Sequence, residues 1–390
     1  MKDLRLALEQ LEQKGLYRRR KILQSPQGRE IILNGQRLVN FSSNDYLGLA
    51  ADHRVKQAFI EAANTWGVGS GSAHLVNGHS QAHHALEEEL ADFIGAPRAL
   101  LFSTGYMANL GIAQSLCDKH DNLIEDKLNH ASLLDAARLS GARLSRYLHC
   151  DYSSLSRQLQ NASGSEILVS SDSVFSMDGD EADISALRQQ CQQHKAWLQL
   201  DDAHGFGVLG KHGRGSLSQQ QITADDSTIY MATLGKALGT AGAFVAASDD
   251  LIEYLIQTAR SYIYTTAMPA AIAQASRISL RLLVTENWRQ QTLLNNINHF
   301  KTLASQAGLK MLDSSTAIQP VIIGDSQMAL QISQHLFENG FHVAAIRPPT
   351  VPRNTARLRI TLSVYHTEQD IEQLITAITT ACLTIKTNEP

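Results

Sequence analysis

The middle of the chain alternates short apolar runs with longer amphipathic stretches that have helical spacing. This alternation predicts an α/β domain with a mostly parallel sheet and helices on both faces. In such a sheet, ligands bind beyond the carboxyl ends of the strands, so the polar residues that follow each run are the candidates for chemistry. The apolar runs lie at residues 99–102, 122–125, 167–170, 197–200, 228–232 and 243–246.

Downstream, the hydrophobic pattern changes. A long helical stretch at residues 267–286 leads into three strand-like runs around a further helix, which predicts a smaller α+β domain. The runs lie at 319–323, 342–345 and 357–362, and the helix at 328–339. We expect three parts: an N-terminal helix and arm (1–45), a large α/β domain (46–285) and a small C-terminal α+β domain (286–390).

Composition and charge narrow the function classes. The 390 residues carry a net charge of -4 without a long basic run, so nucleic acid is a poor partner and a small molecule a better one. Residues 1–15 have the spacing of a surface helix and not the apolar core of a signal peptide, and no segment approaches the roughly 18 apolar residues of a membrane span. The four cysteines lack paired spacing, so we expect neither disulfides nor a metal site, and a reducing cytoplasm suits them; they are Cys117, Cys150, Cys191 and Cys382.

Three polar residues that follow apolar runs suggest a site for a flat aromatic ligand. Asp201 and His204 come after the run at 197–200, spaced so that the carboxylate meets a ring nitrogen and the imidazole a ring hydroxyl. Lys236 lies among small and apolar residues after the run at 228–232, where loss of water favours the neutral, nucleophilic amine. Taken singly, each residue has a plainer interpretation: a helix-capping acid, a structural histidine and a surface lysine.

Other strand ends complete the candidate site. Gly105 and Tyr106 follow a strand and open a helix, whose free N–H groups form a seat for a phosphate. The hydroxyl of Thr233 is placed to reach the same phosphate. His130 can lie flat on a ring, and Ser176 can reach the ring or a substrate. For one of the 15 histidines taken at random, a surface histidine in a helix cap would be the better interpretation. The glycine-rich segment at 67–72 lacks the Lys-Ser/Thr of a P-loop.

Taken in order, these elements resemble the α-oxoamine synthase family of fold-type-I enzymes that depend on pyridoxal phosphate (PLP). The resemblance implies that Lys236 holds PLP as a Schiff base, that Asp201 pairs with the pyridine nitrogen, and that His204 meets the ring hydroxyl. It implies further that His130 stacks on the ring beside Ser176, and that Thr233, Gly105 and Tyr106 hold the phosphate. The motifs that carry it are Asn-Asp-Tyr-Leu-Gly at 44–48, Gly-Ser-Gly-Ser at 69–72, Asn-His-Ala-Ser at 129–132, Ser-Val-Phe-Ser-Met-Asp-Gly at 173–179, Asp-Asp-Ala-His-Gly at 201–205 and Gly-Lys-Ala at 235–237.

Two further segments suggest the substrates within that family. Leu-Tyr-Arg-Arg-Arg at 16–20 and Ala-Ile-Arg-Pro-Pro-Thr-Val-Pro at 345–352 resemble members that join L-alanine to a pimeloyl thioester, on coenzyme A or acyl carrier protein, with loss of carbon dioxide. By that resemblance Arg18, Asn44, His130 and Thr350 contact substrate, and Arg359 takes the amino-acid carboxylate. The alternatives are a synthase that uses glycine with acetyl- or succinyl-coenzyme A, a PLP-fold subunit without catalysis and, more weakly, a dehydrogenase.

The resemblance also implies a homodimer, with Thr265 or Thr266 near the phosphate bound by the partner subunit. Two positions depart from the family pattern: Asp172, where Glu is frequent, and Tyr106, where Phe is common. Any role taken from the longer carboxylate is therefore in doubt at Asp172.

Overall fold

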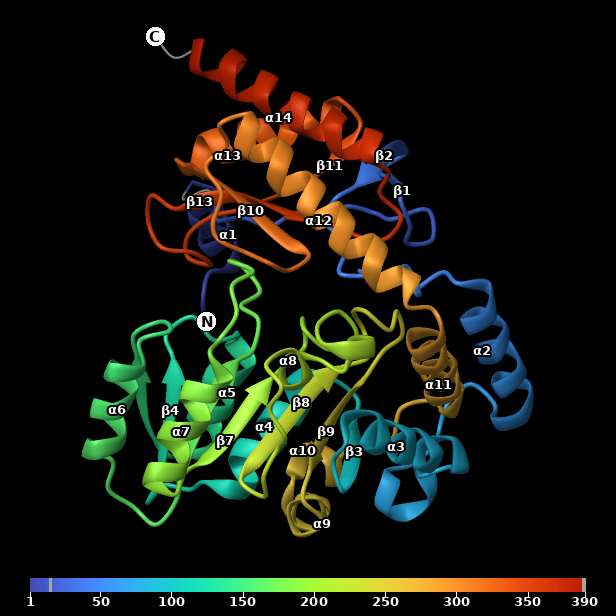
Figure 1. Ribbon diagram of the computed structural model, residues 1–390, viewed down its shortest axis with the longest axis vertical. Helices are drawn as coiled ribbons and strands as arrows, with labels where there is room; N and C mark the ends of the chain where they lie inside the picture. Colours follow the sequence, from blue (N-terminus) through green and yellow to red (C-terminus); the bar gives the residue numbers. More distant parts are fainter. Residues whose placement is uncertain (14–15, 388–390) are drawn as a thin grey trace.

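The computed structural model describes residues 1–13 and 16–387. Two parts lie one above the other in Figure 1, the lower built around the strands β3 to β9 and the upper around shorter strands from both ends of the chain. Among the described residues, no helix has both the length and the apolar character needed to cross a lipid bilayer.

A seven-stranded sheet forms the centre of the lower part. Its strands are β3 (Arg98–Phe102), β4 (Asn122–Asp126), β5 (Arg143–Tyr147), β6 (Ile167–Asp172), β7 (Trp197–Asp201), β8 (Thr228–Thr233) and β9 (Ala243–Ala247). Their order across the sheet is β3-β9-β8-β7-β6-β4-β5, with parallel pairing from β8 to β5, while β9 runs antiparallel to both neighbours. The predicted mostly parallel sheet is confirmed, and all six predicted runs are strands with ends within two residues of the expected ones.

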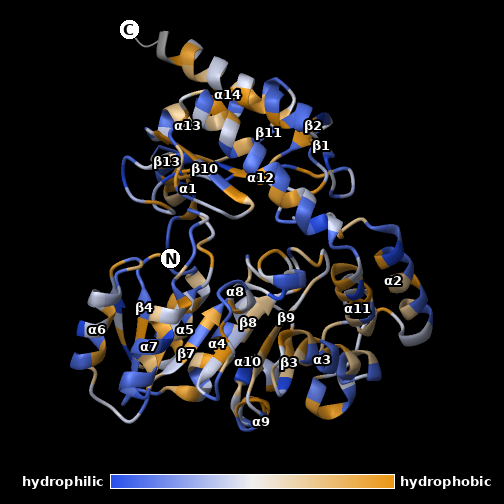
Figure 2. Ribbon diagram, in the orientation of Figure 1, coloured by the Kyte–Doolittle hydropathy of each residue, from blue (hydrophilic) through white to orange (hydrophobic). Residues whose placement is uncertain are grey.

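Alternate residues along each strand feed two hydrophobic cores, one on each face of the sheet. Leu100 and Phe102 pack in one core with helices α4 and α9, and Leu101 packs in the other with α3. The apolar colour of the central strands in Figure 2 reflects burial on both faces, as parallel sheets require. The covering helices are α4 (Gly105–Leu116), α5 (Ala131–Ser140) and α9 (Asp249–Thr258) on one face, and α3 (Gln81–Ile94), α6 (Tyr152–Asn161) and α7 (Ile184–His194) on the other.

Strand β5 was not predicted, because it lacks an apolar run. Its sequence Arg-Leu-Ser-Arg-Tyr has only two apolar residues, and it forms the edge of the sheet, where only Tyr147 is buried. An edge strand has one face and one side toward solvent, so its pattern is weaker than that of a central strand.

The upper part holds two three-stranded sheets. In one, β1 (Glu30–Leu33), β2 (Gln36–Asn40) and β11 (Phe341–His342) lie in the order β1-β2-β11. In the other, β10 (Ile318–Gly324), β13 (Ala356–Thr361) and β12 (Ala344–Ile346) lie in the order β10-β13-β12. The prediction of one strand at 342–345 is wrong: the chain divides at Val343, where β11 pairs with β2 and β12 pairs with β13.

The helices complete the arrangement. The predicted C-terminal helices are present as α11 (Ala270–Thr285) and α13 (Ser326–Glu338), and the N-terminal surface helix is α1 (Leu4–Gln13), which buries no residue. Lys14 and Gly15, the end of that last prediction, lie outside the described residues. The division at residue 285 falls between α11, which packs on α2 and α3, and α12, which packs on α14, and it stays a prediction. The remaining α-helices are α2 (His53–Trp66), α8 (Ser216–Gln219), α10 (Arg260–Ile263), α12 (Trp288–Gln306) and α14 (Glu368–Thr387).

Candidate active site

The carboxyl ends of three neighbouring strands bring the candidate residues together. Asp172, Asp201 and Thr233 are the last residues of β6, β7 and β8, and Asp172 lies directly opposite Asp201 in the sheet. Lys236 follows β8 by three residues. This is the edge at which a parallel sheet binds its ligands.

Lys236 meets His204 in a largely buried environment. The Lys236 Nζ and His204 Nε2 atoms are 2.9 Å apart, and the other ring nitrogen of His204 is 2.6 Å from the hydroxyl of Tyr46. Burial lowers the pKa of Lys236 to about 8, against the opposing effect of the Asp201 and Asp172 carboxylates. Burial, with the nearby lysine, also holds the pKa of His204 well below its ordinary value, so the imidazole is neutral. The expected desolvation of the lysine is therefore present.

Asp201 is fixed by a buried chain of polar side chains that the sequence did not reveal. Its Oδ2 accepts a hydrogen bond from Asn109 Nδ2 at 2.8 Å, and Asn109 Oδ1 accepts one from Gln199 Nε2 at 2.8 Å. Ser170 donates to Gln199 at 3.0 Å, so the orientation of each amide is set by the next. Asn109 and Gln199 are fully buried. Their signal in the sequence is slight: a polar residue in an apolar run and an asparagine one turn into a helix.

His130 begins helix α5 and is held at two points. Its backbone N–H donates to Asp172 Oδ2 at 2.8 Å, and its Nδ1 lies 2.7 Å from the hydroxyl of Ser132. Ser132 also accepts from Asn109, which connects His130 to the chain that fixes Asp201. His130 is thus also the N-cap of α5, as the alternative interpretation expects, and its Nδ1 makes the capping contacts. Its ring is exposed beside the site.

Asp172 and Asp201 form a buried pair of carboxyl groups. Burial, and then the charge of Asp201, raises the pKa of Asp172 well above its ordinary range. Because two adjacent carboxylates do not readily ionise together, Asp172 is the protonated member. Although Asp is shorter than Glu, the Asp172 side chain reaches the backbone N–H of His130 and helps to hold His130 in place.

Arg359 connects the upper part to this edge. Its Nε donates to the backbone oxygen of Ser176 at 2.6 Å, and its terminal nitrogens lie 3.3 and 3.4 Å from Asn44 Oδ1. The hydroxyl of Tyr46 lies 3.3 Å from the same oxygen, so Lys236 is linked through His204, Tyr46 and Asn44 to Arg359. Tyr46 was part of a quoted motif but was not assigned a role.

The loop after β6 carries Ser176 and is pressed against the upper part. Arg357 forms an ion pair with Asp178, and Ser314 Oγ donates to the carbonyl of Gly179 at 2.9 Å. Gly179 has φ +75°, and a Cβ there would collide with the carbonyl of Ile318. The loop therefore needs glycine at this close approach.

The helix start expected at Gly105 and Tyr106 is present, and the phosphate seat there stays a prediction. Thr104 caps α4 by accepting from Met107 N at 3.1 Å, and within the described chain no backbone bond occupies the N–H groups of Gly105 and Tyr106. The Tyr106 hydroxyl instead binds Asp135 on α5. The hydroxyl of Thr233 accepts from Gly235 N and donates to the Gly242 carbonyl at 2.9 Å, so it must rotate to donate to a phosphate.

Two pairs of predicted residues lie apart from Lys236. Arg18 and Thr350 line a common cavity of about 680 Å³, together with Arg347, which the sequence did not single out. Thr265 and Thr266 lie in the turn before α11, where Thr266 bridges to Ala73. Across residues 1–13 and 16–387, no hydrogen bond or ion pair connects either threonine to Lys236, His130, Asp201 or His204.

These features fit PLP chemically. A buried amine with a lowered pKa suits Schiff-base chemistry with an aldehyde, and a carboxylate fixed by amides suits a protonated pyridine nitrogen. In the described chain Asp201 makes no ion pair, so its charge is available to such a ring. The helix start next to it suits the phosphate.

Comparison with known proteins defines the class. The family model for aminotransferase class I and II matches residues 36–378, and the chain belongs to this family, with the fold of the fold-type-I PLP-dependent transferases. A high-resolution structure of serine palmitoyltransferase (SPT) with its PLP internal aldimine is 28% identical, with a TM-score of 0.91 and coverage of 98% of this chain and 97% of the other.

Within that family the chain belongs to the 8-amino-7-oxononanoate synthases. It is 53% identical to the synthase of Pseudomonas fluorescens over 376 residues, which is 96% of each chain. The crystal structure of the synthase from Francisella tularensis is 34% identical, with a TM-score of 0.78 and coverage of 90% of this chain and 99% of the other.

Proposed function

We propose that the chain condenses L-alanine with a pimeloyl thioester, with loss of carbon dioxide, to form 8-amino-7-oxononanoate, using PLP held by Lys236. The observation that carries the proposal is the buried Lys236 amine, with a pKa of about 8, 2.9 Å from a neutral His204. The names of the relatives support the product.

The amine of Lys236 is suited to remove and return a proton at the amino-acid Cα. When bound, PLP supplies an electron sink for the charge left on that carbon. A pKa of about 8 keeps an appreciable share of the amine neutral near pH 7, and the protonated form is acidic enough to return the proton. His204 directs the amine, and Tyr46 holds His204 from behind.

The side chains around Asp201 keep its negative charge in place. Asn109 donates to one oxygen and the backbone of Ala203 to the other, so the carboxylate cannot turn away from a ring nitrogen. Gln199 prevents the Asn109 amide from flipping. The site is therefore set before a ligand arrives, which lowers the cost of reorganisation.

Arg359 is the proposed anchor for the alanine carboxylate. Its partners are the neutral oxygens of Ser176, Asn44 and Thr361, and among the described residues no carboxylate neutralises it. A buried guanidinium with only neutral partners attracts a small carboxylate strongly. His130, whose backbone is held by Asp172, is the proposed ring-stacking residue.

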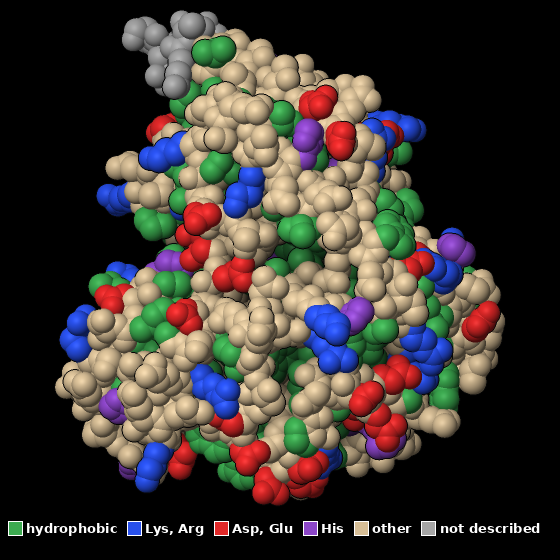
Figure 3. All heavy atoms as spheres, viewed as in Figure 1, with side chains coloured by type: hydrophobic (Ala, Val, Ile, Leu, Met, Phe, Trp, Pro, Cys, Tyr) green, Lys and Arg blue, Asp and Glu red, His purple; other side chains and the backbone are tan. Residues whose placement is uncertain are grey.

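The cavity that Arg18 and Thr350 share is the proposed site for the distal end of the acyl chain. Leu8, Leu11 and Leu16 line it with apolar surface, which suits methylenes, and Arg18 offers a cation for a terminal carboxylate. Acidic and basic side chains are interspersed over the face seen in Figure 3, and the assay described below compares coenzyme A with acyl carrier protein as the carrier.

We propose a homodimer in which Thr265 or Thr266 serves the partner's phosphate. The exposed Thr266 and the neighbouring Tyr264, which is 71% exposed, support a role outside their own subunit. Sedimentation equilibrium of the active protein should give twice the chain mass of 42.8 kDa. An active monomer would contradict this assembly.

An assay of carbon dioxide and thiol release tests the reaction directly. L-alanine or glycine is paired with pimeloyl-, acetyl- or succinyl-coenzyme A, and pimeloyl-acyl carrier protein is included. Release only with L-alanine and a pimeloyl thioester is expected, and comparison of the two pimeloyl donors identifies the carrier. Turnover with glycine and a short thioester would overturn the substrate proposal.

The Lys236→Ala variant tests the lysine. Turnover should fall by at least about 10³-fold, because the variant lacks the amine that moves the proton. Absorbance of bound PLP shows whether the variant still takes up the cofactor. Sustained turnover would contradict the role of Lys236.

A further inference from the structure

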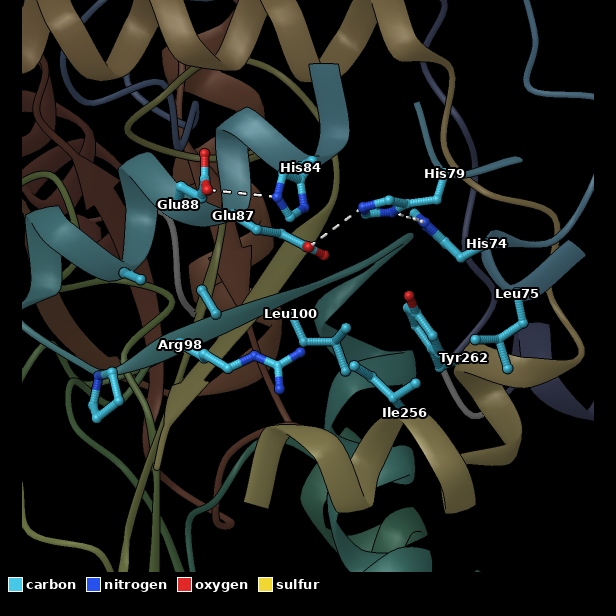
Figure 4. Close-up of a pocket in the computed structure, with 13 residues that line it drawn as sticks. His74, Leu75, His79, His84, Glu87, Glu88, Arg98, Leu100, Ile256 and Tyr262 are labelled. Atoms are coloured by element: carbon cyan, nitrogen blue, oxygen red, sulfur yellow. Dashed lines mark hydrogen bonds and ion pairs between the residues drawn. The ribbon is translucent and has the colours of Figure 1, made fainter. Parts of the chain in front are cut away.

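A second cluster of functional side chains lies beside helix α3, outside the site described above. His74, His79, His84 and Glu87 line a cavity of about 460 Å³ between the start of α3, strand β3 and helix α9. Figure 4 shows the imidazole of His79 directed toward the Glu87 carboxylate, with His84 on the adjacent turn of α3. None of the lining residues belongs to the Lys236 site.

Hydrogen bonds decide which histidines offer a free nitrogen. His83 is fully engaged, since its Nε2 bonds to the Met268 carbonyl at 2.7 Å and its Nδ1 accepts from the Ser80 N–H at 3.0 Å. The Nδ1 atoms of His74 and His79 bond to each other at 2.9 Å. This leaves His79 Nε2 facing the cavity.

The free atoms of three residues converge. One ligand atom each from His79, His84 and Glu87 lies within 4.8 Å of the others, and His79 Nε2 is 3.8 Å from Glu87 Oε2. With zinc bonds of about 2.0–2.1 Å, ligand atoms in a tetrahedron are roughly 3.4 Å apart, so only a small closure is needed. The side chain of His84 is 64% exposed, and its Nε2 would leave Glu88 Oε1, which lies 3.5 Å away, to make this closure.

Neighbouring residues hold two of the three side chains in place, in the way that outer residues usually orient metal ligands. His79 is oriented by the bond to His74, whose ring stacks on Tyr262 with centroids 5.0 Å apart. Glu87 is held because its Oε1 accepts from the Leu101 N–H at 2.9 Å. Such bonds from outer residues set the direction of a ligating imidazole or carboxylate.

The charge balance favours a cation. The Glu87 side chain is 13% exposed, and in the described part of the chain its nearest basic partner is the imidazole of His79 at 3.8 Å, whose pKa burial lowers. Arg98, which also lines the cavity, is paired with Glu253 at 3.1 Å. A buried carboxylate without a close counter-ion is costly, and a bound divalent ion offsets that cost.

We propose that His79, His84 and Glu87 bind a divalent transition-metal ion, with Zn²⁺ as the best match to two imidazoles and a carboxylate. The ion connects the segment before α3 to the helix itself. The same segment is tied at Ser70 to the Met268 carbonyl at 2.6 Å and at Ala73 to Thr266. The role is structural: the ion stabilises the segment that packs against the Thr265–Thr266 turn.

Zinc binding to the PLP-loaded protein tests the site without reference to turnover. Isothermal titration with Zn²⁺, with metal content measured after desalting, should give one ion per chain. His84→Ala and Glu87→Gln should each weaken binding at least about tenfold, since even outer-shell changes cost this much. Glu87→Gln keeps the acceptor for the Leu101 N–H, so folding is preserved.

Two control variants locate the ion. His53→Ala removes an exposed histidine on α2 and should bind zinc as the unchanged protein does. Cys150→Ser disrupts a separate group of possible metal-binding atoms, formed by Asp126, His149 and Cys150. Absence of binding, unchanged binding in both His84→Ala and Glu87→Gln, or loss of binding in Cys150→Ser would each overturn the proposal.

Discussion

Histidines next to carboxyl groups occur in two regions of this molecule, and the two regions are built differently. At the sheet edge, His204 is held at both nitrogens, at 2.6 and 2.9 Å, and Asp201 is fixed by Asn109. Beside α3, His79 is held on one side only and stays 3.8 Å from Glu87. The first arrangement is set in advance for a rigid organic ligand. The second needs an ion to draw its members together.

The largest expected effect is on kcat, and it distinguishes two adjacent carboxylates at the sheet edge, Asp201 and Asp202. Asp201→Asn removes the negative charge meant for the pyridine nitrogen and should lower kcat about 10³-fold. Asp202→Asn is the matched control, because Asp202 accepts from Tyr230 and Ser216 and, among the described residues, makes no hydrogen bond to Lys236 or His204. That variant should lose stability on thermal unfolding and keep most of its turnover per folded molecule. Equal losses of kcat in the two variants would contradict the assignment.

A pH dependence of PLP uptake follows from the lowered pKa of Lys236. The neutral amine is the reactive form, so its fraction rises as pH increases and levels off above a pKa of about 8. The rate of uptake by cofactor-free protein, followed by absorbance, should rise about fifteenfold between roughly pH 6.5 and 8 and then flatten. A rate that continues to climb through about pH 10 would indicate an ordinary lysine.

Asn109 is expected to act as a positioning residue, with a smaller effect. Asn109→Ala leaves Asp201 in place but removes its side-chain donor, which should lower kcat about tenfold. The absorbance of bound PLP should become more sensitive to pH, because the ring nitrogen is held protonated less firmly. If kcat falls while that spectrum and its pH dependence stay unchanged, Asn109 has only a packing role.

The smallest effect on turnover is expected in the region beside α3. Removal of metal with EDTA should change kcat by less than about twofold, because the ion lies outside the Lys236 site. The melting temperature should fall by roughly 5 °C relative to zinc-loaded protein. The melting temperature of His84→Ala should not fall when metal is removed. If it falls as much as that of the unchanged protein, the ion lies elsewhere.

The sequence predicts the central strands well because burial on both faces leaves short runs rich in apolar residues. It misses β5, an edge strand with only two apolar residues, and the division at Val343, where pairing with two different sheets decides the structure. Lys236, Asp201 and His204 are found because the rule about strand ends is local. Asn109 and Gln199 are not found, since the bond from Asn109 to Asp201 and the bond from Gln199 to Asn109 depend on how helix α4 packs against the sheet.

The histidines beside α3 are a similar case. His79 and Glu87 meet because the segment before α3 folds back onto the helix, and their spacing in the sequence matches no familiar metal motif. Their convergence depends on tertiary contacts and is visible only in the folded chain.

The bond from Arg359 to Ser176 has a consequence for how the enzyme can change over evolution or in the laboratory. The acceptor is a backbone oxygen, so no substitution at residue 176 removes it. The direction of Arg359, the proposed anchor for the carboxylate, thus does not depend on the side chain at position 176. A library of variants at position 176 can therefore explore new amino-acid side chains while the guanidinium keeps its direction.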